Sequence, residues 1–282
     1  MTVSVIVLTC NRAHMVREAI DSILSQTNKD FELIVVDNYS SDETEQVIKA
    51  YTDERIRYFR HRNNGLIAVN RNYGIDKARG EYVAFCDDDD LWMPEKLEKQ
   101  LLGFEGDSQI GLVCTNAIDF DRGGEHGKRI KAKLKDSDFT FESLIWGDRI
   151  ICSSVLVRKE VINDVGMMDE SPEISMAPDY ELWLRVARKY KVKYIDLPLV
   201  KYRAHSGACG KKDIEALEQD KMVHKRLLDK GIIAPELYRK RINKLDRRIA
   251  VVKLLTYIRV TKYILPLARL LYNQRWGKWM CG

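Results

Sequence analysis

The amino-acid sequence predicts an α/β fold, with a mostly parallel central sheet flanked by helices and a helical extension at the C-terminus. Over the first 120 residues, short apolar runs alternate with segments whose apolar residues recur at helical spacing. The apolar runs are nearly continuous, as expected of strands that are buried on both faces. Strands that alternate with helices favour parallel pairing through right-handed crossovers.

The elements follow one another along the chain. Strands are predicted at residues 3–9, 31–37, 55–59 and 81–86, and helices at residues 12–26, 41–51, 65–78 and 94–104. The middle is less regular, with strands at 111–118 and 153–157, a loop or hairpin at 120–138, a helix at 179–189 and two short strands around Pro198. After Asp213 the pattern is helical, with breaks expected near Pro235 and Pro266.

The distribution of charge predicts two parts with different tasks. From Lys221 to the end, 16 Lys and Arg stand against three Asp and Glu, whereas the preceding residues are net acidic although the whole chain carries +5. We therefore expect one domain over residues 1–210 and a basic helical extension over residues 211–282. A basic helix can also be simply a solvated face.

Cysteine usage and the first residues predict a cytoplasmic protein. The six cysteines are scattered and form no CxxC pair, which argues against a zinc cluster and for a reducing compartment. Cys10 and Cys86 end apolar runs and are predicted to be buried thiols. No signal peptide and no stretch of 18 apolar residues is found, so no spanning helix is expected.

The most informative motif is the run of four aspartates at 87–90, directly after an apolar strand. Adjacent carboxylates repel one another, so the run needs a cation or hydrogen-bond donors. Carboxylate oxygens select hard cations such as Mg²⁺ or Mn²⁺, and Mg²⁺ usually completes its shell with water and substrate phosphates. The run therefore predicts a metal site for a diphosphate. A solvated loop that caps the next helix is the alternative.

Polar residues follow the other strands at the same predicted edge, where ligands of such sheets bind. Asp37 closes the second strand and is predicted to contact a ligand, whereas Ser40, Ser41 and Asp42 fit helix caps better. Arg71 can pair a phosphate, or can equally form a salt bridge to the acidic run.

Two further candidates lie late in this part of the chain. Asp179 follows Pro178 at a helix start, where it is either a cap or a general base, and Glu181 is the competing base. His205 follows a strand and is either a contact to the metal or diphosphate or a structural histidine.

Taken in order, these residues resemble the family 2 glycosyltransferases. These enzymes invert the configuration at the anomeric carbon and have a GT-A fold with a Rossmann-like nucleotide-binding half. Each piece is weak by itself, and the specificity lies in their order over roughly residues 3–205. The resemblance is carried by residues 3–12, 36–42, 64–65, 71–74, 80–82, 87–92, 165–170, 178–183 and 202–205.

The resemblance implies a sugar transfer from a nucleotide-sugar, with UDP favoured, to a hydroxyl of a glycan or a lipid-linked saccharide in surface polysaccharide or glycoconjugate synthesis. Mn²⁺ or Mg²⁺ would be the cofactor. It implies donor binding by Thr9, Asn11, Arg12, Asp37, Arg71 and Asp88, metal binding by Asp89, Asp87 and His205, and Asp179 as the catalytic base.

The sequence departs from the family pattern at two positions. Tyr39 stands where the family usually has a small residue, often Gly, so the base pocket is expected to differ. The helix start reads Pro178-Asp179 where Glu-Asp is common, which keeps the Asp.

Two other classes of protein stay open at this stage. A nucleotidyltransferase would carry a Gly-rich basic loop after the first strand, which Thr9–Arg12 lacks. A non-catalytic carbohydrate-binding module would leave Asp179 without a task. The acidic cleft argues against a nucleic-acid partner.

The C-terminal helices predict peripheral contact with an anionic membrane through residues 247–282. Basic residues there lie beside large apolar ones, with Arg248, Arg259 and Lys262 on one helix side and Trp276 and Trp279 beyond. Packing on the catalytic domain or a homo-oligomer contact would explain the same pattern. Membrane contact would place the protein at the cytoplasmic face.

Overall fold

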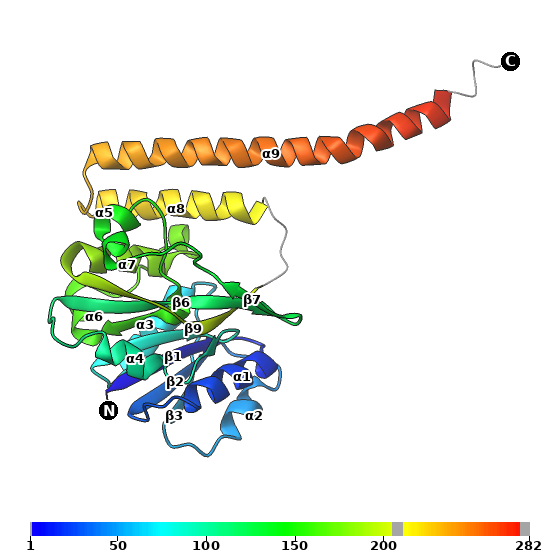
Figure 1. Cartoon of the computed structure of the whole chain (residues 1–282). Coiled ribbons are helices and arrows are strands. Elements are labelled where there is room, and N and C mark those ends of the chain that lie inside the picture. The colour runs from blue at the N-terminus through cyan, green and yellow to red at the C-terminus, as the bar shows by residue number, and fades with distance from the viewer. Residues whose placement is uncertain (1, 205–210, 277–282) are drawn as a thin grey trace. The chain divides into compact units, whose positions relative to one another are not determined.

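A computed structural model of the chain describes residues 2–204 and 211–276, with side chains described for residues 2–204 and 214–256. The chain divides into two compact units, Met1–His205 and Ser206–Gly282. Each unit is considered by itself below. Figure 1 shows the first as a sheet with helices around it and the second as helices.

One half of the sheet in the first unit is parallel. It consists of β1 (Val3–Thr9), β2 (Phe31–Asp37), β3 (Ile56–Arg60) and β4 (Tyr82–Asp87), in the order β3-β2-β1-β4. Seven residues pair between β1 and β2, from Val3 opposite Phe31 to Thr9 opposite Asp37. Every residue of β2 is buried, which is why its sequence reads as one apolar run with only Glu32 and Asp37 as charged members.

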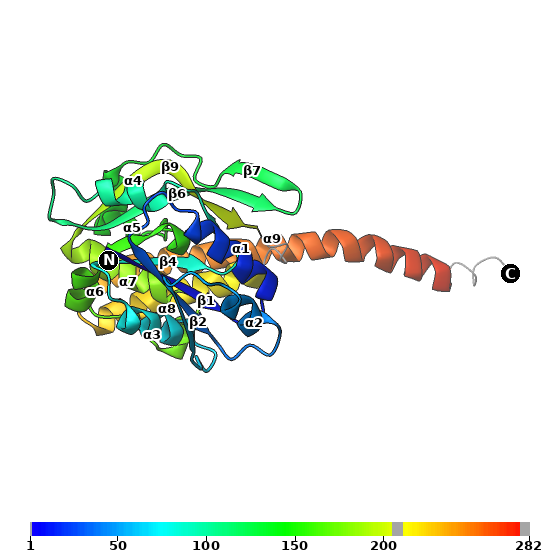
Figure 2. The same cartoon turned by 90° about the horizontal axis from the view of Figure 1, so that it is seen from below.

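The other half of the sheet mixes directions. Beyond β4 the order continues β8-β6-β9-β5, with β8 antiparallel to β4 and β6, and β6 parallel to β9. These strands are β5 (Leu91–Trp92), β6 (Ile110–Asp121), β8 (Leu156–Arg158) and β9 (Lys191–Arg203), and β6 continues into a hairpin with β7 (Gly124–Lys128). Figure 2 shows β6, β7 and β9 on one side and β1 and β2 on the other, with β4 and β8 between them in the sheet order.

Amphipathic helices cover the sheet. In α1 the buried residues Val16, Ala19, Ile20 and Ile23 follow helical spacing, and Val16, Ile20 and Ile23 pack into the main apolar cluster with β1 and β2 residues. The other helices of this unit are α2 (Thr44–Lys49), α3 (Ile67–Lys77), α4 (Lys96–Leu102), α5 (Phe141–Leu144), α6 (Lys159–Val165) and α7 (Pro178–Lys189), with α1 at Ala13–Leu24. Short 3₁₀ helices are η1 (Asp136–Phe139), η2 (Cys152–Ser154) and η3 (Pro172–Ile174).

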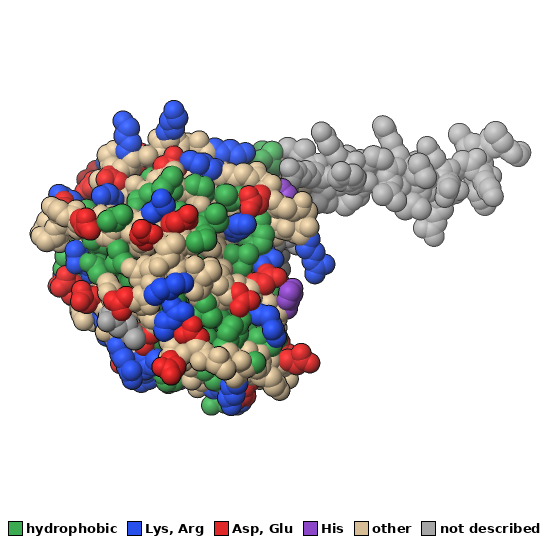
Figure 3. Space-filling model, turned by 60° about the horizontal axis from the view of Figure 1, so that its bottom comes forward, with side chains coloured by type: hydrophobic (Ala, Val, Ile, Leu, Met, Phe, Trp, Pro, Cys, Tyr) green, Lys and Arg blue, Asp and Glu red, His purple; other side chains and the backbone are tan. Residues whose placement is uncertain are grey.

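The surface of the molecule mixes charges. On the face shown in Figure 3, acidic and basic side chains lie interspersed with apolar ones. This pattern agrees with exposed ion pairs such as Lys189–Asp164 at 3.1 Å and Arg129–Asp119 at 2.7 Å. Pairs of this exposed kind add little to stability.

The described residues of the second unit form two helices, α8 (Lys211–Asp229) and α9 (Pro235–Trp276). Leu217 of α8 packs with Leu245 and Ile249 of α9 in a small apolar cluster. Lys221 adds an ion pair to Asp246 at 2.9 Å, and Arg241 hydrogen-bonds to Asp220. Within the described residues, no helix combines the length and apolar character that crossing a bilayer requires.

The predicted α/β class with a helical C-terminal part is confirmed, and four local expectations need correction. β9 is one strand through Pro198 rather than two, and α9 continues through Pro266, although it does begin at Pro235. The mixed half of the sheet makes it less parallel than the alternation of elements suggested. Cys86 is buried as expected, but Cys10 is exposed because β1 ends at Thr9 and leaves it in the loop.

Candidate functional site

The site is assembled where three parallel strands end. Thr9 pairs with Asp37 across β1 and β2, and Leu8 pairs with Asp87 across β1 and β4. Because parallel strands point the same way, the loops after all three strands meet at one edge. The structure therefore brings together the three polar loops that the sequence singled out.

Arg12 links the first loop to the acidic run. Its Nη1 donates to Asp88 Oδ1 at 2.7 Å and to Asp89 Oδ2 at 3.0 Å. Burial raises the pKa of Asp88, while Arg12 and the Thr9 hydroxyl act in the opposite direction. The positive charge of one guanidinium thus offsets the repulsion between two neighbouring carboxylates of the acidic run.

Asp90 fastens the acidic run to β9. Its Oδ1 accepts a hydrogen bond from the Arg203 backbone N–H at 3.0 Å, and the Arg203 side chain donates to the Asp89 carbonyl at 2.8 Å. Burial, with the nearby charge of Asp87, raises the pKa of Asp90 to about 8. Asp90 is 1% exposed, which fits a structural task better than ligand contact.

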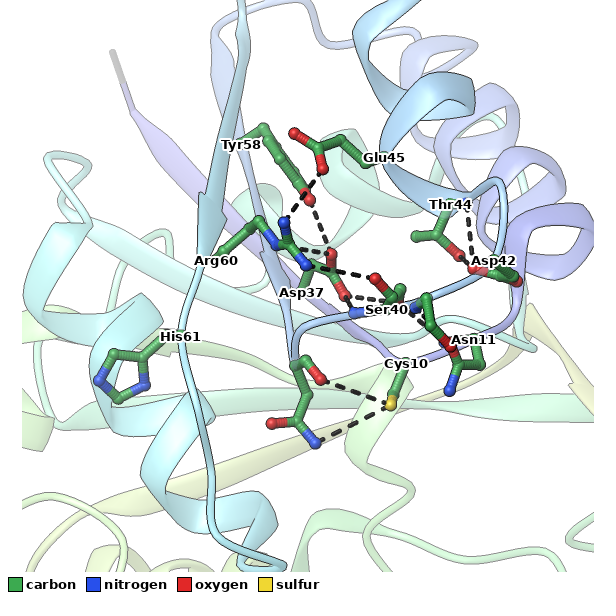
Figure 4. A network of polar contacts seen from close by, with 12 residues as sticks. Cys10, Asn11, Asp37, Ser40, Asp42, Thr44, Glu45, Tyr58, Arg60 and His61 are labelled. Atoms are coloured by element: carbon green, nitrogen blue, oxygen red, sulfur yellow. Dashed lines mark hydrogen bonds and ion pairs between the residues drawn. The ribbon is translucent and has the colours of Figure 1, made fainter.

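Asp37 is fully buried and organises the second loop (Figure 4). Its Oδ1 accepts hydrogen bonds from the Ser40 N–H at 2.9 Å and the Ser40 hydroxyl at 2.5 Å. Its Oδ2 accepts one from the Tyr58 hydroxyl at 2.7 Å, with Arg60 Nε 3.8 Å away. The carboxylate that was expected to face a base thus also holds its own loop, and its ligand contact stays a prediction.

Asn11 ties the first loop to the second, as Figure 4 shows. It adopts a left-handed backbone (φ 53°), which Asn tolerates better than most residues. Its N–H donates to Ser40 Oγ at 2.8 Å, and its Oδ1 accepts from the Ser41 N–H at 2.7 Å. Asp42 accepts from the N–H groups of Ala13 and Thr44, the first residues of α1 and α2, as its predicted capping task requires.

Tyr39 is held between two arginines at the edge of this loop. Its ring is 45% exposed, and the guanidinium carbons of Arg60 and Arg62 lie 4.7 and 4.6 Å from the ring centre. Its backbone is left-handed as well (φ 54°), a conformation that favours glycine. This explains why a small residue would suit the position, and it leaves an exposed aromatic ring two residues after Asp37.

Arg71 joins the acidic run to α7. It is 5% exposed, and its Nη2 lies 2.9 Å from Asp87 Oδ1 while its Nη1 lies 3.6 Å from Asp179 Oδ2. The salt bridge to the acidic run is thus present. It brings Asp87 and Asp179, 92 positions apart in the sequence, to the same guanidinium.

Asp179 and Glu181, the two candidate bases, differ in burial. Glu181 is fully buried and forms a bidentate pair with Arg185, with Nη2 to Oε2 at 2.8 Å. Arg185 also donates to the backbone carbonyls of Val165, Gly166 and Met167, so the pair fastens this loop to α7. Asp179 keeps 18% of its side chain exposed, and its role as the base stays a prediction. His205 lies outside the described residues.

A cavity of about 710 Å³ opens beside Asp87 and Asp179. Its other walls come from the base of the β6–β7 hairpin, the segment that follows it and the loop before η2. A volume of this size falls within the range of small-ligand sites.

Several contributors to the site were not found from the sequence. The Ser153 hydroxyl accepts a hydrogen bond from the Asp87 N–H at 3.0 Å, and the Ser153 carbonyl accepts one from Trp92 Nε1 at 3.0 Å. Through these two bonds η2 holds the start of the acidic run. Tyr58 holds Asp37, and no local motif marks either residue. Arg203 lies in the Tyr202–His205 segment that was already singled out, and its position beside a candidate histidine was the available signal.

The carboxylates of the acidic run have the oxygen ligands that hard divalent cations prefer. Among residues 2–204 and the described part of the helical unit, no three His, Cys, Asp or Glu side chains are grouped to hold a metal. Mg²⁺ typically takes one or two protein carboxylates and completes its shell with water and phosphate oxygens. Asp89 and Asp87 at the strand end offer such an oxygen-only set.

The family model described as Glycosyl transferase family 2 matches residues 4–166. The chain belongs to this family. It is 33% identical over 228 residues to an uncharacterized glycosyltransferase of Rickettsia typhi, covering 77% of this chain and 68% of that protein. It is also 28% identical over 228 residues to the putative teichuronic acid biosynthesis glycosyltransferase TuaG of Bacillus subtilis, covering 80% and 88%. Other relatives are longer, and the chain covers 31% of one from Rickettsia bellii.

Solved structures give the fold. Staphylococcus aureus TarS superposes with a TM-score of 0.64 at 20% identity, over 81% of this chain and 40% of TarS. The mannosyltransferase PcManGT of Pyrobaculum calidifontis gives 0.65 at 19% identity, over 97% of this chain and 79% of that protein. The glycosyltransferase has a GT-A fold, as the sequence predicted.

Proposed function

We propose that this glycosyltransferase moves a sugar from a nucleotide-sugar, a UDP-sugar by preference, to a hydroxyl of a glycan or a lipid-linked saccharide. The observation that carries the proposal is the arrangement around Arg71, where Asp87 of the acidic run and Asp179 meet at the mouth of one cavity. The loops proposed to bind the nucleotide-sugar and the proposed general base are thus adjacent. The similar TarS structure in complex with UDP-GlcNAc, and the PcManGT structure with GDP-mannose and Mn²⁺, support a nucleotide-sugar donor.

The donor side would be formed by the loops after β1, β2 and β4. Thr9, Asn11, Arg12 and Asp37 would line the nucleoside pocket, with Asp88 at the ribose and Arg71 near the phosphates. Arg12 now binds Asp88 and Asp89, so we expect its guanidinium to shift when a diphosphate enters. Its 46% exposed side chain has the freedom to do so.

Asp89 would hold Mn²⁺ or Mg²⁺, with help from Asp87 and His205. A bound divalent cation supplies charge stabilisation to the departing nucleoside diphosphate. The acidic run, compensated in part by Arg12, is the part of this chain suited to that task.

We infer an inverting single displacement. The acceptor oxygen forms a bond to the anomeric carbon while the bond from that carbon to the diphosphate oxygen breaks. The proton of the acceptor hydroxyl moves to Asp179, which acts as general base. Arg71 holds this carboxylate toward the cavity, and the buried Glu181–Arg185 pair fixes the start of α7 from behind.

The helical unit would serve surface polysaccharide or glycoconjugate synthesis by bringing the catalytic domain (residues 1–210) to a lipid-linked acceptor. The basic extension, residues 211–282, would contact the cytoplasmic face of the membrane without spanning it, or join a second copy of the chain. Its charge balance supports the first task.

The substitution Asp179→Asn tests the proposal. Loss of a positioned base should lower transfer roughly 100- to 10,000-fold while nucleotide-sugar binding is kept. Product formation gives the rate, and a thermal-shift screen of nucleotide-sugars with and without Mn²⁺ gives binding.

Asp76→Asn is the matched control, because Asp76 is exposed and lies away from the site. Transfer by Asp179→Asn within a few-fold of the unaltered protein, with donor binding unchanged, would remove Asp179 as the base. A screen in which no nucleotide-sugar stabilises the protein would count against the proposed donor class.

A further inference from the structure

The cavity beside Asp179 differs in origin from the donor side. Of the residues proposed for donor, metal and base that the structure describes, Asp87 and Asp179 line it. Its remaining walls come from Asp119, from four residues between Arg129 and Leu134, from residues 148–152 and from Tyr202, all of which follow the acidic run in sequence. Figure 2 shows β6, β7 and β9 apart from β1 and β2, whose loops belong to the proposed donor side.

Part of the cavity lining is apolar. It consists of Ile130, Ala132, Leu134, Ile150 and Ile151. The C–H face of a pyranose ring can pack on such a wall, since ligand sites combine an apolar lining with a few polar groups that fix orientation. An apolar wall beside a proposed base would orient a sugar ring rather than a diphosphate.

The charged groups in the cavity do not favour an anion. Four carboxylates line it, from Asp87, Asp119, Asp148 and Asp179, against the two guanidinium groups of Arg129 and Arg149. Arg129 pairs with Asp119 at 2.7 Å and its guanidinium carbon lies 3.9 Å from the ring centre of Tyr202. Arg71 pairs with both Asp87 and Asp179, so with its charge included the four carboxylates still exceed the three guanidinium groups by one. Carboxylates accept hydrogen bonds from hydroxyl groups but repel a second anion.

We infer that this cavity is the acceptor site and that it takes the uncharged sugar at the end of the acceptor, in preference to a uronic acid or a phosphate-bearing sugar. The inference rests on the proposed function, because the cavity faces Asp179. The apolar wall contacts the ring, Tyr202 and the carboxylates bind hydroxyl groups, and Asp179 takes the proton of the attacking hydroxyl.

The first experiment compares acceptors on the full chain. Octyl glycosides of glucose, galactose, mannose and N-acetylglucosamine are offered beside octyl glucuronide, with UDP-GlcNAc, UDP-glucose or GDP-mannose as donor and Mn²⁺ present. Disaccharide product and released nucleoside diphosphate are measured together, which separates transfer from hydrolysis. We expect product with at least one neutral glycoside and at least tenfold less with the glucuronide, a difference of about 1.4 kcal/mol.

The second experiment fills the cavity. Ala132→Trp should lower the ratio of transfer to donor hydrolysis roughly 100-fold, because a displaced acceptor is no longer aligned for attack. Lys133→Trp is the control: the residue is adjacent and exposed but does not line the cavity, so its ratio should match that of the unaltered protein. Thermal midpoints of both variants verify folding.

The outcomes separate this inference from the proposed function. Donor hydrolysis without transfer to any neutral glycoside, equal use of the glucuronide, or an unchanged ratio in Ala132→Trp each overturns the acceptor inference alone. Absence of any donor consumption by the unaltered protein overturns the proposed function and the inference with it.

Discussion

At the scale of single residues, Lys96 is a buried cation with no role in the proposed chemistry. Its side chain is fully buried in α4, Nζ donates to Gln100 Oε1 at 2.6 Å, and it lies 3.8 Å from the ring centre of Trp92. Burial lowers its pKa from 10.5 to about 7. Trp92 in turn donates to the carbonyl of Ser153, whose hydroxyl accepts the Asp87 N–H. Lys96 therefore packs against a residue that helps to hold the acidic run in place.

Lys96 should make the free energy of unfolding depend on pH. Between about 7 and 10.5 the unfolded chain keeps the proton that the folded chain has lost, so stability should increase with pH there, by up to about 1.4 kcal/mol per pH unit. Lys96→Met should remove this slope and raise stability at pH 7. Urea unfolding from pH 6.5 to 9.5 measures both effects. Lys99→Met, on the same helix, should keep the slope, and an equal slope in Lys96→Met would contradict the prediction.

Residue types near strand ends were predictable from the sequence, but their partners were not. The meeting of Thr9, Asp37 and Asp87 follows from parallel strands alone. The burial of Asp37 depends on Tyr58, 21 positions later, and the support of Asp87 depends on Ser153, 66 positions later. Contacts over such separations depend on tertiary packing, which periodicity does not encode.

At the scale of elements, α3 packs so closely on β1 that it requires glycine. A Cβ added to Gly74 would lie 2.6 Å from Cγ2 of the buried Ile6. Gly74→Ala should therefore lower the free energy of unfolding by about 1–3 kcal/mol through overpacking, despite the better helix propensity of Ala. Denaturant unfolding measures the change.

The double variant Ile6→Ala/Gly74→Ala isolates this contact. Removing the Ile6 side chain creates the space that a methyl group at position 74 needs. The stability losses of the two single variants should therefore add up to more than the loss measured for the double variant, by at least about 0.5 kcal/mol. Additive costs, or a Gly74→Ala variant as stable as the unaltered protein, would show that the helix moves aside freely.

Periodicity predicted most elements of the first unit but misjudged two prolines. Pro198 stays within β9 because the pairing with β6 shifts register opposite it, so the missing N–H falls at an irregularity. Pro266 interrupts one hydrogen bond of α9 without ending it, and Figure 1 shows the helix bending toward its C-terminal end. In both cases neighbouring hydrogen bonds in a long element outweigh the one that proline removes.

At the scale of the whole molecule, the charge asymmetry of the sequence coincides with two compact units. The basic stretch from Lys221 onward belongs to the helical unit, and the acidic remainder lies almost wholly in the first unit. In α9, Leu245, Ile249 and Val252 face the apolar cluster with α8. Val251, Leu254 and Leu255 are instead 54–58% exposed, so the helix carries a second apolar stripe.

This exposed stripe predicts binding to anionic vesicles. Lys244, Arg248, Val251 and Leu255 recur at helical spacing on one side of α9, so cations and apolar side chains can reach a membrane surface together. The full chain should therefore sediment with phosphatidylglycerol vesicles and not with phosphatidylcholine vesicles. Binding should weaken as salt screens the charges.

Two double variants divide the contributions to that binding. Leu254→Gln/Leu255→Gln should lose the apolar part and bind weakly at all salt concentrations, whereas Arg247→Gln/Arg248→Gln should lose mainly the salt-dependent part, worth about 1 kcal/mol per basic residue near the surface. Thr256→Gln, an exposed change beside Val252 rather than on the stripe, is the control. If all four proteins bind alike, the stripe is not a membrane contact. If light scattering instead shows that the unaltered protein is a dimer and the leucine variant a monomer, the stripe joins two copies of the chain. The exposed apolar side chains of one α9 would then be buried against those of a second α9.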